Sequence, residues 1–160
     1  MWTLEGWRYV AIVVDLFSRQ VVGWAASPDM PASLVCDALA MALGQRRPPP
    51  GLIVHSDRGS QYASREYRAL LERQALTGSM SRKGNGWDNA VMERFFLSLK
   101  QERVWQRRHA NPAEAKRDIT DYIVSFYNSR CLHSTLGNLP PNAYDRNQAD
   151  KQPILVSIKT

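Results

Sequence analysis

Two acidic residues in contrasting settings constrain the fold of this chain more than any other feature. Asp57 follows the apolar run Leu52–His55, which predicts a short buried strand, and Glu93 lies inside a predicted helix. Residues 58 to 92 separate the two acids, which is 92 − 58 + 1 = 35 positions. Ligands of open α/β sheets bind beyond the carboxyl ends of strands, and Asp57 stands at such an end. The fold has to bring a strand end and a helix face together if the two acids share a site.

The order of the expected elements predicts an α/β domain with a mixed sheet. The β-branched and aromatic run Trp7–Asp15 and the run Gln20–Ala26 are predicted strands, and their short connection predicts an antiparallel hairpin. We expect further strands at Leu52–His55 and Ala75–Met80, helices at Pro31–Leu43, Ser64–Gln74, Asp88 or Asn89 to Arg103, and Pro112–Tyr127, and a loop-like remainder from Asn128. Because Leu52–His55 follows a helix, we expect it to lie parallel to an earlier strand.

Length, charge and hydropathy narrow the class of protein. The chain has 160 residues, 44% of them apolar, which is enough for one domain with a core. Its net charge of +6 suits a polyanionic partner such as nucleic acid. No apolar run is long enough to cross a membrane, and the N-terminus does not resemble a signal peptide, so we expect a cytoplasmic protein without a membrane partner.

The two acids suggest a site for a divalent cation. Carboxylates that converge on one cleft repel each other unless a cation separates them, and hard oxygen ligands suit Mg²⁺ or Mn²⁺. Sites of this kind commonly need a third carboxylate to hold two ions beside a phosphodiester. Each acid also has a simpler interpretation, since Asp57 can serve as a turn residue and Glu93 as a helix-surface residue. His55 alternates with Asp57 on the strand, and we interpret it as a hydrogen-bonded residue at the sheet end.

Basic residues near the two acids are candidates for DNA contacts. Lys100 follows Glu93 by two helical turns and could place a cation on a phosphate, although an exposed helix lysine is the simpler interpretation. Arg82 and Lys83 precede the glycine-broken segment 84–86, for which we predict a mobile loop. Among the basic clusters of the chain, this pair is the one that we expect to touch DNA.

Several motifs together resemble a known family. In order along the chain they are His55–Tyr62, the interval of 35 positions, Gly86–Phe96, Leu99-Lys100, Tyr127–Arg130 and His133–Gly137. From about Leu4 to Asn147 the chain resembles the catalytic subunit of bacterial insertion-sequence transposases, which are relatives of retroviral integrases with an RNase H-like core and an Asp-Asp-Glu metal site. The resemblance implies a catalytic core over residues 1–147, with a C-terminal tail over 148–160.

The resemblance also implies roles for particular residues and partners. Asp57 would be the second acid of the triad, Glu93 the third, and Lys100 the contact to the transposon end. Mg²⁺ or Mn²⁺ would be the cofactor. The partners would be DNA, as transposon ends and target, further copies of the chain, and an upstream helix-turn-helix transposase subunit.

The first acid of the family pattern is missing from this sequence. In similar proteins it lies on a first strand immediately before the turn that here spans Thr3–Trp7, and the sequence starts at Met1. That strand is central in RNase H-like sheets, so we expect the sheet to lack it and to leave two inner edges unpaired. Asp15 is a weaker alternative for the missing acid, because its expected role is to bond the hairpin, and Glu5 is weaker still.

Three functions stay open on these grounds. The first is a transposase catalytic domain that cleaves and joins DNA, expected here as a truncated and inactive copy. The second is a non-catalytic remnant that binds DNA or pairs with an intact transposase. The third is an RNase H-like structure-specific nuclease, which would share the acids without the C-terminal motifs.

Overall fold

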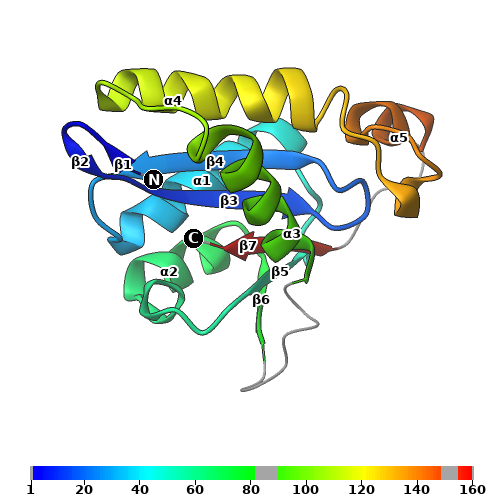
Figure 1. Cartoon of the computed structure of the whole chain (residues 1–160). Coiled ribbons are helices and arrows are strands. Elements are labelled where there is room, and N and C mark those ends of the chain that lie inside the picture. Colours follow the sequence, from blue (N-terminus) through cyan, green and yellow to red (C-terminus); the bar gives the residue numbers. More distant parts are fainter. Residues whose placement is uncertain (1, 82–89, 149–154, 160) are drawn as a thin grey trace.

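A five-stranded mixed sheet forms the centre of the molecule (Figure 1). The computed structural model describes residues 2–81, 90–148 and 155–159. The sheet strands are β3 (Tyr9–Asp15), β4 (Val21–Ser27), β5 (Ile53–Ser56), β6 (Thr77–Met80) and β7 (Leu155–Lys159), in the spatial order β4-β3-β7-β5-β6. Two short strands, β1 (Trp2–Thr3) and β2 (Gly6–Trp7), form a separate antiparallel pair. The predicted hairpin is confirmed, since β3 and β4 pair antiparallel.

Helices cover both faces of the sheet and begin where the sequence supplies caps. They are α1 (Ala32–Arg46), α2 (Arg65–Arg73), α3 (Ala90–Leu99), α4 (Pro112–Asp121) and α5 (Pro141–Asn147), with π-helical turns at Lys100–Val104 and Tyr122–Tyr127 and short 3-10 turns at Ser60–Ala63 and Ser134–Leu136. The Ser64 side chain accepts the N–H of Tyr67 at the start of α2, and Asn111 accepts the N–H of Glu114 at the start of α4. Both helices begin within one residue of the starts predicted from the sequence.

Alternate residues of β3 pack into two different cores. Ala11 and Val13 lie in a cluster with α1, α2, Val54 of β5 and Ile158 of β7. Ile12 and Val14 lie in a second cluster with α3, α4 and the π-helical turn that follows α4. Because successive side chains of a strand point to opposite faces, the sheet is the middle layer of three.

The contact between α1 and β4 is unusually close at Gly23. A Cβ atom built on Gly23 would lie 2.2 Å from the carbonyl oxygen of Ala38 and 2.9 Å from the Cβ of Ala42. No side chain fits in that space, so the glycine allows the helix backbone to rest directly on the strand.

The pairing of β5 differs from the sequence-based expectation. In the described part of the chain β5 is parallel to β6 and to β7, both of which follow it, so the prediction of an earlier parallel partner was wrong. The region after Asn128, predicted to be loop-like, contains α5 and β7. The inner edges of β3 and β5, expected to be unpaired, both hydrogen-bond to β7, because a strand distant in sequence occupies the position between them.

Candidate functional site

Asp57 lies directly beyond the carboxyl end of β5, and it is half-buried. Val54 and Ser56 of this strand are buried, with Val54 in the core of α1 and α2. By strand alternation, His55 belongs to the face of the sheet opposite to Val54. The Oδ1 atom of Asp57 accepts the N–H of Gly59 at 2.9 Å, a bond typical of a turn aspartate. This bond engages one carboxylate oxygen, so a turn role and a ligand role are compatible.

His55 is held by serine hydroxyls of the neighbouring strand and its extension. Its Nδ1 lies 3.1 Å from Ser79 Oγ and its Nε2 lies 3.0 Å from Ser81 Oγ. Arg58 donates from Nε to the carbonyl of Ser81 at 2.9 Å. Both ring nitrogens therefore have protein partners, which agrees with the interpretation of His55 as a hydrogen-bonded residue at the sheet end. Arg82 and Lys83, the predicted DNA contacts, and the predicted mobile loop at 84–86 lie outside the described residues.

Glu93 and Lys100 share the exposed face of α3 and its continuation. The helix buries Met92, Phe95 and Leu99 against the sheet, while Glu93 and Lys100 are exposed. Leu97, between them on the same face, is 51% exposed. Lys100 begins the π-helical turn, in which the N–H of Trp105 donates to the Lys100 carbonyl at 2.9 Å. The predicted spacing of two turns between the carboxylate and the ammonium is present, on a face directed away from the core.

Helix α3 packs on the face of the sheet formed by Ile12 and Val14 of β3, and Asp57 follows the carboxyl end of β5. A two-carboxylate site of this kind offers hard oxygen ligands that suit Mg²⁺ or Mn²⁺. Within residues 2–81, 90–148 and 155–159, no group of three or more His, Cys, Asp or Glu residues is placed to hold a metal ion. The described residues therefore fit part of a metal centre, and the joint role of Asp57 and Glu93 stays a prediction.

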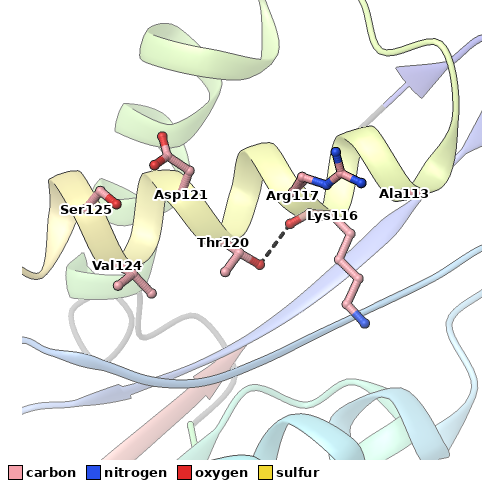
Figure 2. Close-up of a pocket in the computed structure, with 7 residues that line it drawn as sticks. All are labelled: Ala113, Lys116, Arg117, Thr120, Asp121, Val124 and Ser125. Carbon is pink, nitrogen blue, oxygen red and sulfur yellow. Dashed lines mark hydrogen bonds between the residues drawn. The ribbon is translucent and has the colours of Figure 1, made fainter.

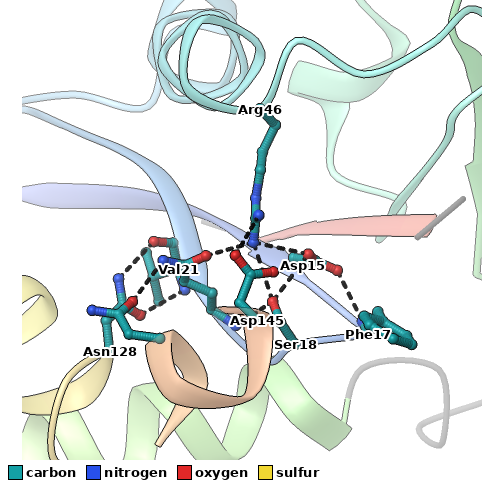
Figure 3. Close-up of polar contacts among 9 residues, drawn as sticks. Asp15, Phe17, Ser18, Val21, Arg46, Asn128 and Asp145 are labelled. Atoms are coloured by element: carbon teal, nitrogen blue, oxygen red, sulfur yellow. Dashed lines mark hydrogen bonds and ion pairs between the residues drawn. The ribbon is translucent and has the colours of Figure 1, made fainter. Parts of the chain in front are cut away.

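Asp15, the alternative for the missing acid, is committed to a buried polar network (Figure 3). Its Oδ1 accepts the N–H of Phe17 at 2.9 Å. Its Oδ2 accepts from Ser18 Oγ at 3.0 Å and forms an ion pair with Arg46 at 3.1 Å. The same arginine pairs with Asp145 of α5 at 2.8 Å. Asp15 therefore forms hydrogen bonds within the hairpin turn, as expected from the sequence. Through Arg46 it also links the hairpin to α1 and α5.

At Val21 the outer edge of β4 is hydrogen-bonded to a side-chain amide (Figure 3). Asn128 accepts the N–H of Val21 at its Oδ1 and donates from Nδ2 to the Val21 carbonyl, each at 2.9 Å. The amide thus copies the pair of bonds that a neighbouring strand would make. Asn128 belongs to the motif Tyr127–Arg130, so at least one residue of that motif has a structural role.

Two arginines from distant elements gather near His133, a feature that sequence reasoning missed. The pKa of His133 is lowered, first by burial and then by the positive charges of Arg19 and Arg94. Arg19 occupies the hairpin turn with a φ of 61°, and Arg94 follows Glu93 on α3. The ring of His133 packs edge-on against Tyr127, with centroids 5.2 Å apart. The sequence does not reveal that Arg19 and Arg94 lie near His133. Their proximity arises only when α3 packs beside the hairpin.

A shallow depression of about 560 Å³ lies on α4 and the π-helical turn after it (Figure 2). Its lining residues are Ala113, Lys116, Arg117, Thr120, Asp121, Val124 and Ser125. Asp121 forms an ion pair with Arg103 at 3.2 Å, and Thr120 donates to the Lys116 carbonyl at 2.8 Å. Among the predicted site residues that the structure describes, Asp57, Glu93 and Lys100 do not line this depression.

Among the described helices, none combines the length and the apolar content that crossing a membrane would require.

The sequence matches one protein family along most of its length. The integrase core domain family matches residues 1–86, and a second description of the integrase core domain matches residues 74–141. Transposase InsF for insertion sequence IS3A from Escherichia coli (strain K12) is 47% identical over 143 residues, covering 89% of this chain and 50% of that protein. The transposase for insertion sequence element IS904 from Lactococcus lactis subsp. lactis (strain IL1403) is 43% identical, covering 90% of this chain and 57% of that protein. The chain thus spans about half the length of these curated relatives.

Solved structures with the same fold come from retroviral integrases. A chain of the simian T-cell lymphotropic virus intasome, in complex with PP2A regulatory subunit B56 gamma, matches with a TM-score of 0.70 and 15% identity, covering 96% of this chain and 51% of that chain. The HTLV-2 integrase catalytic core domain in complex with magnesium, in a trimeric form, matches with a TM-score of 0.61 and 14% identity. That match covers 82% of this chain and 81% of that chain. The likeness confirms the predicted RNase H-like fold.

Proposed function

Because the chain belongs to the integrase core domain family and is a core of the insertion-sequence transposase type, we propose that it acts on DNA during transposition. The reaction would be metal-dependent cleavage of a phosphodiester followed by strand transfer. One observation supports the proposal: in a chain with an RNase H-like fold, Asp57 follows the carboxyl end of β5 and Glu93 lies on α3.

Asp57 and Glu93 would hold the divalent cation. Their carboxylates suit Mg²⁺, the ion with which the HTLV-2 integrase core is in complex, and they suit Mn²⁺ equally. When bound, such a cation neutralises the negative charge that builds on a phosphodiester under attack. Asp57 is pre-oriented by its bond to the N–H of Gly59. Glu93 stands on a helix whose opposite face packs in the core.

Basic side chains would hold the DNA backbone. Lys100 lies two turns from Glu93 on the exposed face of α3. Arg82 and Lys83 are the further proposed contacts, and Arg19 and Arg94 add positive charge near His133. The net charge of +6 favours a polyanion at long range. Phosphate contacts of this kind position DNA without reading its sequence.

The proposed partners follow from the relatives. The two retroviral structures are an intasome and a trimeric catalytic core, and we propose that this chain also works in an oligomer on transposon ends and target DNA. A separate helix-turn-helix transposase subunit would supply the recognition of the ends.

A second function, DNA binding without catalysis, is favoured by one specific observation. The described residues provide no cluster of three potential ligands, whereas two-ion phosphodiester chemistry commonly needs a third carboxylate. A protein with this surface and an incomplete metal centre would bind DNA ends or pair with a complete transposase.

Cleavage and strand-transfer assays separate the two functions. Purified protein is mixed with labelled insertion-sequence end DNA in Mg²⁺, and binding and product formation are measured in parallel. The matched variants are Glu93→Gln and Glu72→Gln, which remove the same charge from exposed positions on α3 and α2. Products that disappear only in Glu93→Gln support the enzyme. Salt-sensitive binding without products supports the second function, and the absence of both would refute the proposal.

A further inference from the structure

Three segments that are far apart in the sequence meet beside α3. The ring of Phe95 on α3 packs edge-on against Tyr127, with centroids 4.8 Å apart, and Tyr127 packs in the same way against His133 at 5.2 Å. The hairpin joins this group at Val21, which exchanges two hydrogen bonds with the Asn128 side chain. These contacts place the hairpin turn, α3 and the residues around 133 next to one another.

Two of these segments carry an arginine. Arg19 lies in the hairpin turn, and Arg94 lies on α3. The pKa of His133 is lowered, first by burial and then by the charges of both arginines. The pKa of Tyr127 is raised by burial and then by Cys131, and the same two positive charges act in the opposite direction. Both guanidinium groups therefore lie near both rings.

Neither arginine forms an ion pair with an acid in the described part of the chain. The basic residues that do so within residues 2–81, 90–148 and 155–159 are Arg46, Arg103, Arg107 and His109. Arg94 is exposed and Arg19 is half-buried, so an ion from solution can reach them. Two neighbouring positive charges repel each other, and an anion between them would remove that repulsion.

His133 gives a second, independent indication of a ligand. Its Nε2 is buried and has no hydrogen-bond partner among the described residues. Buried polar atoms rarely lack a partner, and an exception indicates a bound water or ion. A neutral imidazole with its proton on Nε2 would donate to a phosphate oxygen held between the arginines. Exposed side chains change rotamer within nanoseconds, so Arg94 can move to admit that oxygen.

We propose that Arg19, Arg94 and His133 form a binding site for one phosphate group of the DNA backbone. The forked donors of a guanidinium match two phosphate oxygens, which makes arginine well suited to this role. Arg94 directly follows Glu93, and consecutive Cα atoms are about 3.8 Å apart, so a strand held here also reaches the proposed metal ligand. The site positions DNA and takes no part in bond breaking. The inference rests on the proposed action on DNA and adds a specific contact to it.

DNA binding by matched variants tests the site. A labelled duplex is titrated with the full chain at several salt concentrations, and the affinity is measured by anisotropy. We expect Arg19→Gln and Arg94→Gln each to weaken binding by about 3- to 10-fold and to reduce the slope of log affinity against log salt. Arg65→Gln removes the same charge from an exposed position of α2 and should change neither quantity. Arg19→Lys keeps the charge and should retain most of the affinity.

The double variant of Arg19→Gln and Arg94→Gln tests whether the two arginines hold the same phosphate. Residues that share one partner are coupled, so the double variant should weaken binding by less than the product of the two single effects. A loss equal to that product would assign the arginines to separate phosphates and would overturn the shared site.

The ring nitrogens of His133 report on the site directly by NMR. We expect the Nε2 signal of His133 to move saturably when the duplex is added, and to move less in Arg94→Gln. His109, which is buried with its Nε2 3.0 Å from Asp118, is the internal control and should not respond. A response of His133 to inorganic phosphate without a response to the duplex would assign a site for a free anion and overturn the inference. So would a His133 signal that responds to neither.

Failure of this inference is distinguishable from failure of the proposed function. Salt-dependent DNA binding in which Arg19→Gln and Arg94→Gln behave like Arg65→Gln would remove the site and retain the action on DNA. Absence of DNA binding by the unchanged chain would count against the proposed function itself, and the site would fall with it.

Discussion

At the scale of single residues, substitution in the ion pair between Asp15 and Arg46 should lower the stability of the protein. Asp15 is 2% exposed, and Arg46 connects it to Asp145 and to the carbonyl oxygen of the Gln20 side chain (Figure 3). Removing one member of a buried pair leaves the other charge without compensation, which costs more than the pair itself contributes.

Arg46→Gln should therefore destabilise the protein by about 2–3 kcal/mol, less than a fully buried pair because Arg46 is partly solvated. Arg47→Gln is the matched control, since Arg47 is exposed and follows directly. Urea unfolding of both variants measures the difference. Equal stability of the two variants would show that Asp15 is satisfied by Ser18 and Phe17 alone.

His133 predicts a pH dependence of stability. Its pKa in the folded protein is lowered from 6.5 by burial and by the charges of Arg19 and Arg94, so the folded state favours the neutral imidazole. The unfolded chain then binds more protons on acidification. The contribution of His133 is complete above pH 6.5 and is lost as the pH falls through the lower pKa of the folded state.

NMR titration checks this sign. Arg19→Gln should move the pKa of His133 upward toward its ordinary value, because it removes a nearby like charge. Arg65→Gln, at an exposed position of α2, should leave the pKa unchanged. A downward movement in Arg19→Gln would contradict the assigned cause.

At the scale of elements, the starts of α2 and α4 and the hairpin could be predicted, and the pairing partners of β5 could not. Ser64 and Asn111 act on neighbouring N–H groups, so local sequence is sufficient to predict the helix starts. The hairpin follows from two strand-type runs with a short connection. The π-helical turn at Tyr122–Tyr127 was not predicted, because its apolar spacing also fits an α-helix.

The contact of α1 with β4 gives a prediction at this scale. Gly23→Ala should destabilise the fold by more than about 2 kcal/mol, since the new methyl group would meet backbone atoms of α1 that cannot move independently. Gly44→Ala lies within α1 with open space around its Cβ position, and it should stabilise by up to about 1 kcal/mol. Thermal unfolding of the pair measures both signs, and stabilisation by Gly23→Ala would show that the helix can shift.

At the scale of the whole molecule, the fold family was predictable from the sequence, and the completion of the sheet by β7 was not. Motifs around Asp57 and Glu93 indicated the RNase H-like core that the comparisons confirm. The strand β7 has only five residues and no distinctive pattern, so its position depends on the space between β3 and β5. The gathering of Arg19 and Arg94 near His133 is likewise a product of tertiary packing.

The charged surface provides the test at this scale. If the α3 face contacts DNA, Lys100→Gln should weaken binding to all sequences alike and reduce the slope of log affinity against log salt by about one. Lys116→Gln removes a positive charge from the depression on α4, away from the α3 face. It should leave the slope of log affinity against log salt unchanged. The opposite pattern in filter-binding or anisotropy measurements would transfer the DNA contact from α3 to α4.

The central position of β7 has a consequence for biogenesis. The hairpin is synthesised early, yet its inner edge finds a partner only after residue 159 has been translated and has cleared the ribosome exit tunnel. Until then the nascent chain carries two exposed backbone edges, and long-range pairing of this kind is slow to form. The pairing of β3 and β5 with β7 thus joins segments far apart in the sequence, so this part of the sheet should form late in folding.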